Sequence, residues 1–164
     1  MLAAADDLRP LYRVIKILGA AAIAILALGL VEFLAFEPLG QHSGLSARVE
    51  GVFRYDPAAH QTSGADSSRF SATEDFAAVI DWSSLPSSTV AGASWSNSLG
   101  TVVGGVGPKS AGQMTEADRT VPVKVPSGLT RNIPGQYLFV VERFRSGQPV
   151  EVLARRLVLV RRGT

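Results

Sequence analysis

The stretch Thr101–Gly112, TVVGGVGPKSAG, carries the residue types of a phosphate-binding loop, since a β-branched run enters glycines and then Lys109. Such a loop reads G-x-x-x-x-G-K-S/T, because successive backbone N–H groups must point at the phosphates. Here Pro108, which has no N–H, precedes the lysine, and the residues that follow are a poor helix start. The dinucleotide pattern G-x-G-x-x-G fails too, because Ser110 stands at its last glycine. The stretch is therefore predicted to be a turn that binds no nucleotide.

Other reactive side chains are scattered along the sequence. The two histidines, His42 and His60, have no cysteines or grouped carboxylates beside them, which argues against a metal site. Residues 96–100, SNSLG, lack the first glycine of the G-x-S-x-G elbow of serine hydrolases. The acidic pair Glu74-Asp75 and the later Asp81 admit an acid–base interpretation, but polar strand edges carry such residues routinely. We therefore predict neither an enzyme nor a bound cofactor.

The composition bounds the class of protein. Charged residues make up 18% of the 164 residues, below the roughly 25% of soluble domains. Sixteen Lys and Arg against fourteen Asp and Glu give a net charge of +2, too near balance to indicate a nucleic-acid partner. The chain has no cysteine, which excludes a disulfide framework and a lipoprotein anchor.

An apolar run near the N-terminus accounts for the low charge. Residues 17–36, ILGAAAIAILALGLVEFLAF, contain one charged residue, Glu32, and no polar stripe. A helix of this length spans roughly 30 Å, the thickness of the hydrocarbon core of a bilayer. Arg9, Arg13 and Lys16 precede the run, so the positive-inside rule places residues 1–16 in the cytoplasm and the chain after about Glu37 outside it. The sequence predicts a single-pass protein of the plasma membrane.

A cleaved signal peptide is the alternative interpretation of the same run. Signal peptides have an apolar region of about 7–15 residues that ends in small residues of the A-x-A type. The run here is longer and ends in EFLAFEP without that pattern, which favours an uncleaved anchor.

Small residues on the predicted helix suggest a packing face for another helix. Glu32 either reaches the headgroups or joins a helix–helix contact, since Ala22, Gly29 and Glu32 can share one flank. A second small-residue stripe includes Ala35. The candidate helix-packing residues are Ala20, Ala24, Ala27, Gly29 and Glu32.

Residues 37–45 read as a juxtamembrane linker, and after it the hydrophobic period changes from helical to two. The alternation in 47–55 predicts a strand, residues 56–75 a polar loop with one short strand near Phe70, and 76–82 and 89–95 two further strands. Asn97–Gly100 is a hairpin connection into a strand that starts at Thr101. Trp82 and Trp95 are predicted core anchors.

The C-terminal third predicts a long β-hairpin. The run Tyr137–Phe144 and the run Val150–Val160 are separated by the turn residues Ser146-Gly147-Gln148. Tyr137, Phe139 and Val141 should share the buried face, with the Tyr137 hydroxyl bonded at its edge. Seven or eight short strands between Ala47 and Arg161 indicate a mainly β domain, residues 46–164, folded as an antiparallel β-sandwich.

The order of these elements resembles bacterial membrane-anchored or secreted domains of the immunoglobulin-like or fibronectin-like type. The resemblance covers Phe76 to Val160, and it lacks the cysteine pair of antibody domains. It implies adhesion, complex assembly or a spacer role, which narrows the function little. The matching segments are Ile80-Asp81-Trp82, Leu85-Pro86, Val90–Trp95, Pro134-Gly135-Gln136-Tyr137 and Leu157–Val160.

Arginines cluster in the last strand and tail. Strand alternation would place Leu153, Leu157 and Leu159 on one face with Arg155 and Arg161, so a bulge near Arg155-Arg156 is expected. The cluster is either a solvated strand face, with Glu142 and Glu151 as cross-strand partners, or a patch that contacts anionic lipid or an acidic protein surface. The candidate contact residues are Arg155, Arg156, Arg161 and Arg162.

Together these features predict a non-enzymatic accessory or assembly subunit of a membrane complex, with an extracytoplasmic β-sandwich. The alternative is an adhesion or ligand-binding module of the cell envelope on a membrane anchor. The expected partners are the lipid bilayer and other membrane or envelope proteins. A pilin-like subunit is a third class, but no prepilin processing site or early glutamate is recognisable.

Overall fold

The computed structural model describes residues 43–162, which belong to a compact unit that runs from Gln41 to Thr164. The predicted cytoplasmic segment, the apolar run 17–36 and the candidate helix-packing residues lie outside the described residues. Between residues 43 and 162, no helix is long and apolar enough to cross a membrane.

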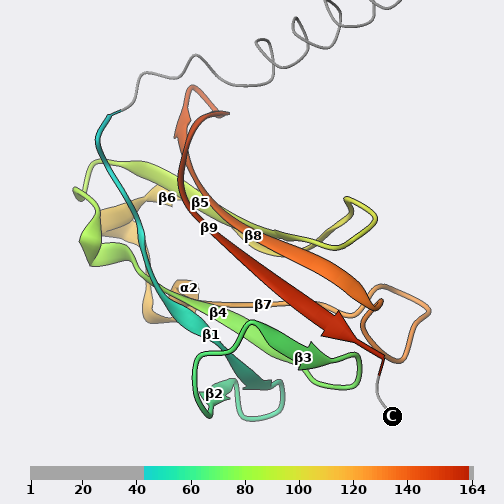
Figure 1. Ribbon diagram of the computed structural model, residues 1–164. Helices are drawn as coiled ribbons and strands as arrows, with labels where there is room; N and C mark the ends of the chain where they lie inside the picture. The colour runs from blue at the N-terminus through green and yellow to red at the C-terminus, as the bar shows by residue number, and fades with distance from the viewer. Residues whose placement is uncertain (1–42, 163–164) are drawn as a thin grey trace, which may run out of the picture. The chain divides into compact units, whose positions relative to one another are not determined.

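Most of the regular structure in residues 43–162 is strand (Figure 1). One short α-helix and two 3-10 turns, α2 (Glu116–Arg119), η1 (Trp82–Ser84) and η2 (Ala111–Gln113), interrupt the strands. The strands are β1 (Arg48–Asp56), β2 (Gln61–Ser63), β3 (Arg69–Ser71), β4 (Phe76–Asp81), β5 (Val90–Ser96), β6 (Val102–Ser110), β7 (Thr120–Pro122), β8 (Gly135–Arg145) and β9 (Gln148–Arg161).

The strands form two sheets, which Figure 1 shows as two layers. The first has the order β2-β1-β4-β7, and the second has the order β3-β9-β8-β5-β6. The predicted mainly β fold is confirmed, and the two layers are compatible with a β-sandwich. One pairing differs from the expected antiparallel pattern, because β3 runs parallel to β9.

An aromatic cluster fills the space between the sheets. Phe76 of β4 meets Trp95 of β5 edge-on at 5.5 Å between ring centroids, and Trp95 lies 4.8 Å from Phe139 of β8. All three side chains are fully buried. The Trp95 Nε1–H donates to the carbonyl of Val121, 2.9 Å away, so its one polar group is satisfied across the sheets. Trp95 is thus the core anchor that the sequence predicts.

The glycine stretch after Thr101 is a strand, so the predicted turn is wrong. β6 continues through it to Ser110 and pairs with β5. A Cβ on Gly104 would lie 2.3 Å from the carbonyl oxygen of Pro122, and one on Gly105 would lie 2.7 Å from that of Ala93. Gly104 therefore lets the edge of one sheet approach β7 of the other closely, and the Lys124 amide donates to Val103 O at 2.6 Å there. Gly105 likewise lies close to the neighbouring strand β5 of its own sheet.

The terminal hairpin is confirmed, and it is the longest pairing between strands in the described chain. β8 and β9 pair from Gly135–Val160 to Arg145–Gln148 around a turn at Ser146 and Gly147, both of which have positive φ. The Tyr137 hydroxyl accepts a hydrogen bond from the Ile133 amide at 3.1 Å, as expected for a buried phenol near an edge.

The faces of β9 are assigned differently from the sequence prediction. Val141 opposes Ala154 while Glu142 opposes Val152, so Leu153 is an extra residue and the bulge precedes the expected one at Arg155-Arg156. The shift turns Val158 and Val160 inward, each 1% exposed. It leaves Leu157 and Leu159 on the outer face, 56% and 37% exposed.

A bulge also changes the predicted alternation of β1. Phe53 and Tyr55 belong to the alternating residues that predict this strand, and both are half-buried, whereas the deeply buried side chain is that of Val52. The pairing with β4 shifts between Val49 and Gly51, which moves the later residues by one position.

Candidate functional site

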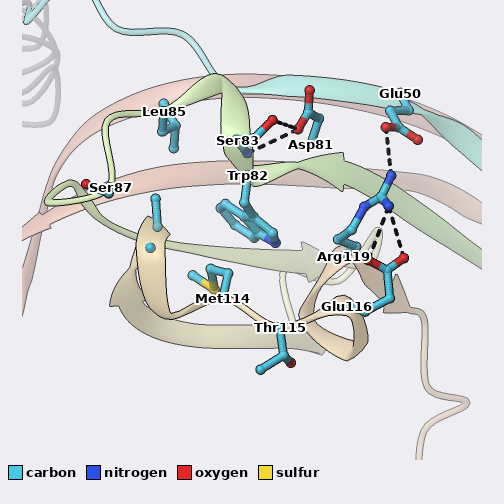
Figure 2. Close-up of a pocket in the computed structure, with 12 residues that line it drawn as sticks. Glu50, Asp81, Trp82, Ser83, Leu85, Ser87, Met114, Thr115, Glu116 and Arg119 are labelled. Atoms are coloured by element: carbon cyan, nitrogen blue, oxygen red, sulfur yellow. Dashed lines mark hydrogen bonds and ion pairs between the residues drawn. The ribbon is translucent and has the colours of Figure 1, made fainter.

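A pocket of about 630 Å³ opens where the end of β4 meets η1, η2 and α2 (Figure 2). It brings together three segments that are separate in sequence: Glu50, residues 81–87 and residues 111–119. Leu85 and Met114 supply apolar lining, and Trp82 lies in the middle of the view. Charged residues from β1, β4 and α2 complete the lining: Glu50, Asp81, Glu116 and Arg119.

The charges of the pocket are arranged around Arg119. Its guanidinium donates to Glu116 at 3.0 Å and to Glu50 at 2.9 Å, and Figure 2 shows it between these two carboxylates. These contacts, that with Glu116 first, raise the pKa of Arg119. Because two carboxylates share one guanidinium, the site keeps negative charge.

Asp81 caps the turn that shapes one side of the pocket. Its Oδ1 accepts hydrogen bonds from the Ser83 hydroxyl at 2.6 Å and the Ser83 amide at 3.1 Å. These bonds, above all that from the hydroxyl, lower the pKa of Asp81. Asp81 is therefore an ionised carboxylate at neutral pH, and it adds to the negative charge beside Trp82.

Asp118 forms hydrogen bonds that connect η1, β6 and α2 beside the pocket. Its carbonyl accepts from Trp82 Nε1 at 2.9 Å, and its carboxylate accepts from Lys109 Nζ and the Thr115 amide, both at 2.8 Å. The Lys109 bond is the largest of the causes that lower the pKa of Asp118 to about 2. The lysine of the apparent phosphate motif is thus ion-paired beside the pocket.

The carboxylates considered for acid–base work do not form one site. Glu74 precedes β4, where it accepts from the Ser71 amide at 2.6 Å and pairs with Arg54 at 2.8 Å. Asp81 ends the same strand, so the two lie at opposite ends of it. His60 bonds the Tyr55 hydroxyl at 3.0 Å, and His42 lies outside the described residues. No group of three potential metal ligands occurs in residues 43–162.

The arginines of the predicted cluster do not all lie on the same face of β9. Arg155 and Arg161 lie on the outer face of β9, the face opposite to the buried Val158 and Val160. Arg156 instead pairs with Asp66 at 3.4 Å. Arg162 is exposed just after the strand.

A carboxylate on the terminal hairpin holds the start of the domain. Glu151 is 9% exposed, and it accepts from the Ser43 amide at 2.9 Å and the Ser43 hydroxyl at 2.7 Å. It also pairs with Arg143 at 2.8 Å, which fulfils the expected cross-strand role of Glu151. The Ser43 bonds and, to a lesser extent, Arg143 lower its pKa.

Sequence reasoning missed both the pocket and the Ser43–Glu151 contact. The pocket had one local signal, the capping box of Thr115 and Asp118 that starts α2. The contact joins residues 108 positions apart, which no local pattern reveals. No protein-family model matches the chain, and no curated protein or solved structure matches it either.

Proposed function

We propose that this chain is a non-enzymatic, single-pass accessory or assembly subunit of a membrane complex in the cell envelope. The apolar run 17–36 serves as the anchor, with residues 1–16 in the cytoplasm and the β domain outside. The observation that carries the proposal is the short distance in sequence between that run and Ser43, which is bonded to the domain.

Ser43, the first described residue, is joined to the domain through its two bonds to Glu151. Only residues 37–42 lie between it and the end of the apolar run. Fully extended, the chain from Phe36 to Ser43 spans at most about 25 Å. A domain on so short a tether works at the membrane surface, where an accessory subunit meets its partners.

We further propose that the domain is immunoglobulin-like or fibronectin-like. Without β2 and β3, the sheets have the orders β1-β4-β7 and β9-β8-β5-β6, which correspond to A-B-E and G-F-C-C′ of that fold. Trp95 then occupies strand C, where such domains carry a buried tryptophan. Tyr137 begins strand F and bonds backbone four residues upstream, as in a tyrosine corner. Phe139, two residues on, takes the place of a cysteine.

The acidic pocket favours a second candidate function, a ligand-binding or adhesion module on the same anchor. Its carboxylates suit a ligand that is cationic or rich in hydroxyl groups, and Leu85 and Met114 suit a small apolar part. Asp81→Asn should weaken binding of such a ligand by calorimetry. Asp56→Asn is the matched control, because Asp56 ends β1 outside the pocket.

The orientation is tested by thiol labelling in intact cells. Because the chain has no cysteine, Leu99→Cys gives a single thiol on an exposed turn residue. It should react with an impermeant maleimide before lysis, and the mature protein should still begin at Met1 or Leu2. Labelling only after lysis, or a chain that begins beyond Phe36, would contradict the proposal.

The assembly role is tested by affinity purification from detergent-solubilised membranes. Stoichiometric membrane partners should be recovered with the wild type and lost with Ala24→Leu, which fills the candidate helix-packing face. Ala21→Leu adds the same volume outside the proposed packing residues, so it should keep them. Recovery of the chain alone, with binding of a soluble ligand, would favour the second candidate.

A further inference from the structure

The outer face of the second sheet combines exposed leucines with arginines. Leu138 of β8 pairs directly with Leu157 of β9, and Leu159 is the next outward residue on β9. All three are exposed, by 38%, 56% and 37%. On this face the strands β9 and β3 also carry three arginines. The Leu–Arg face is defined as Arg69, Leu138, Arg155, Leu157, Leu159 and Arg161.

The arginines surround the leucines along the strands. Arg155 and Arg161 lie two residues before Leu157 and two residues after Leu159, on the same side of β9. Arg69 of β3 is the pairing partner of Leu159. None of these three makes an ion pair with another residue between 43 and 162, whereas Arg54, Arg119, Arg143 and Arg156 all do. Glu142 of β8 lies on the same side as Leu138, and no ion pair joins it to these three arginines within residues 43–162. The face therefore carries an excess of positive charge around an apolar centre.

We propose that the Leu–Arg face docks on the anionic headgroup surface of the bilayer. Apolar side chains that enter the headgroup boundary, with cations that contact acidic lipid, are the two elements of interfacial binding. Each arginine near such a surface strengthens binding about five-fold, from roughly 1 kcal/mol per residue.

An anionic membrane surface fits the Leu–Arg face better than a second copy of the domain does. An isologous contact would set the three arginines of one face against those of its partner, with only Glu142 on that side of β8 to compensate them. The inference also rests on the proposed anchor, because the tether of residues 37–42 keeps the domain near lipid at a high effective concentration.

The experiment uses the full chain in proteoliposomes made from neutral lipid or from neutral and anionic lipid. A single Leu157→Cys carries an environment-sensitive fluorophore, and lipid-borne nitroxides report its contact with the bilayer. Gln61→Cys, on an exposed residue of the other sheet, is the control position for the label. Quenching is expected at position 157 in anionic membranes only, and it should fall with salt.

Two matched variants test the role of the arginines. Arg155→Ala with Arg161→Ala should weaken docking about twenty-five-fold, which is about five-fold for each arginine. Arg48→Ala with Lys124→Ala removes the same charge from exposed positions outside the face, and it should leave docking unchanged. Equal effects of the two double variants would overturn the proposal.

The remaining outcomes separate the face from the anchor. Carbonate extraction of the vesicles reports the anchor alone. If carbonate removes the chain but salt-sensitive quenching at position 157 persists, the anchor is wrong and the face stands. If the label at position 157 is not quenched in either membrane, lipid docking is overturned and an acidic protein becomes the expected partner of the face. If the fluorescence at position 157 depends on protein concentration in neutral membranes, lipid docking is overturned in favour of contact with a second copy.

Discussion

The two faces of the terminal hairpin both carry large apolar side chains, but only one of the faces is buried. The inner face carries Tyr137, Phe139 and Val141, each fully buried, and the outer face carries Leu138 and Leu157, both exposed. The inner residues belong to the hydrophobic core together with Phe76 and Trp95. The outer residues are not part of that core, although they are equally apolar. Hydrophobicity in a strand therefore does not by itself indicate which face is the core.

The largest expected effect comes from the inner face. Phe139→Ala should lower the free energy of unfolding by about 3–5 kcal/mol, because it empties space beside Trp95 in a close-packed core. The measurement is denaturant unfolding of the fragment 41–164, which we expect to fold alone with a β-type circular dichroism spectrum. A loss below that of Phe144→Ala would mean that the register of the hairpin is wrong.

The next effect comes from the carboxylate at the start of the domain. Glu151→Gln should cost about 1.5–3 kcal/mol at neutral pH, the range for hydrogen bonds to a charged group. A fragment that begins at Leu45 should lose a similar amount, because it lacks Ser43. If the fragment that begins at Leu45 unfolds at the same denaturant concentration as the fragment 41–164, the bonds of Ser43 do not stabilise the domain.

The same contact predicts a dependence on pH. The folded domain holds the pKa of Glu151 below its ordinary value of 4.5. Its contribution is therefore complete above that value and is lost as pH falls through the lower, folded pKa. The difference between wild type and Glu151→Gln should shrink below about pH 4.5. Urea melts from pH 7 to pH 3 check this, and a constant difference would contradict it.

A smaller effect is expected at the turn end of the outer face. Phe144 is half-buried, and a Cβ on Gly92 would lie 3.2 Å from its ring, so the ring rests over that glycine. Phe144→Ala should cost about 1 kcal/mol, since only part of its surface leaves water on folding. Denaturant melts beside Phe139→Ala give the ratio directly, and a loss above 3 kcal/mol would place Phe144 in the core.

The sequence predicted those parts of the fold that depend on local pattern. The hairpin, the short strand near Phe70 and the burial of Trp95 follow from alternation and turn residues. The glycines of β6 were misread, because glycine marks a turn and a close approach of two backbones equally well. The faces of β9 were misassigned, because a bulge at Leu153 reverses the parity and leaves no composition signal.

The candidate site was less predictable than the fold. Lys109 and Asp118 come together only because β6 and α2 meet, and Ser43 reaches Glu151 only once the terminal hairpin has formed. Such contacts depend on tertiary packing, which a single sequence does not display. Arg155 and Arg156 are neighbours in sequence, yet alternation sends them to opposite faces.

Two neighbouring residues of β9 test the central claim, that the hairpin buries one face in the core and leaves the other exposed. Leu157 is 56% exposed and Val158 is 1% exposed. In denaturant melts of the fragment 41–164, Val158→Ser should lower the free energy of unfolding by about 2–4 kcal/mol, from lost burial and a buried hydroxyl. Leu157→Ser should change it by at most about 0.5 kcal/mol, as surface substitutions do. Equal losses, or a greater loss at Leu157, would contradict the division of the two faces.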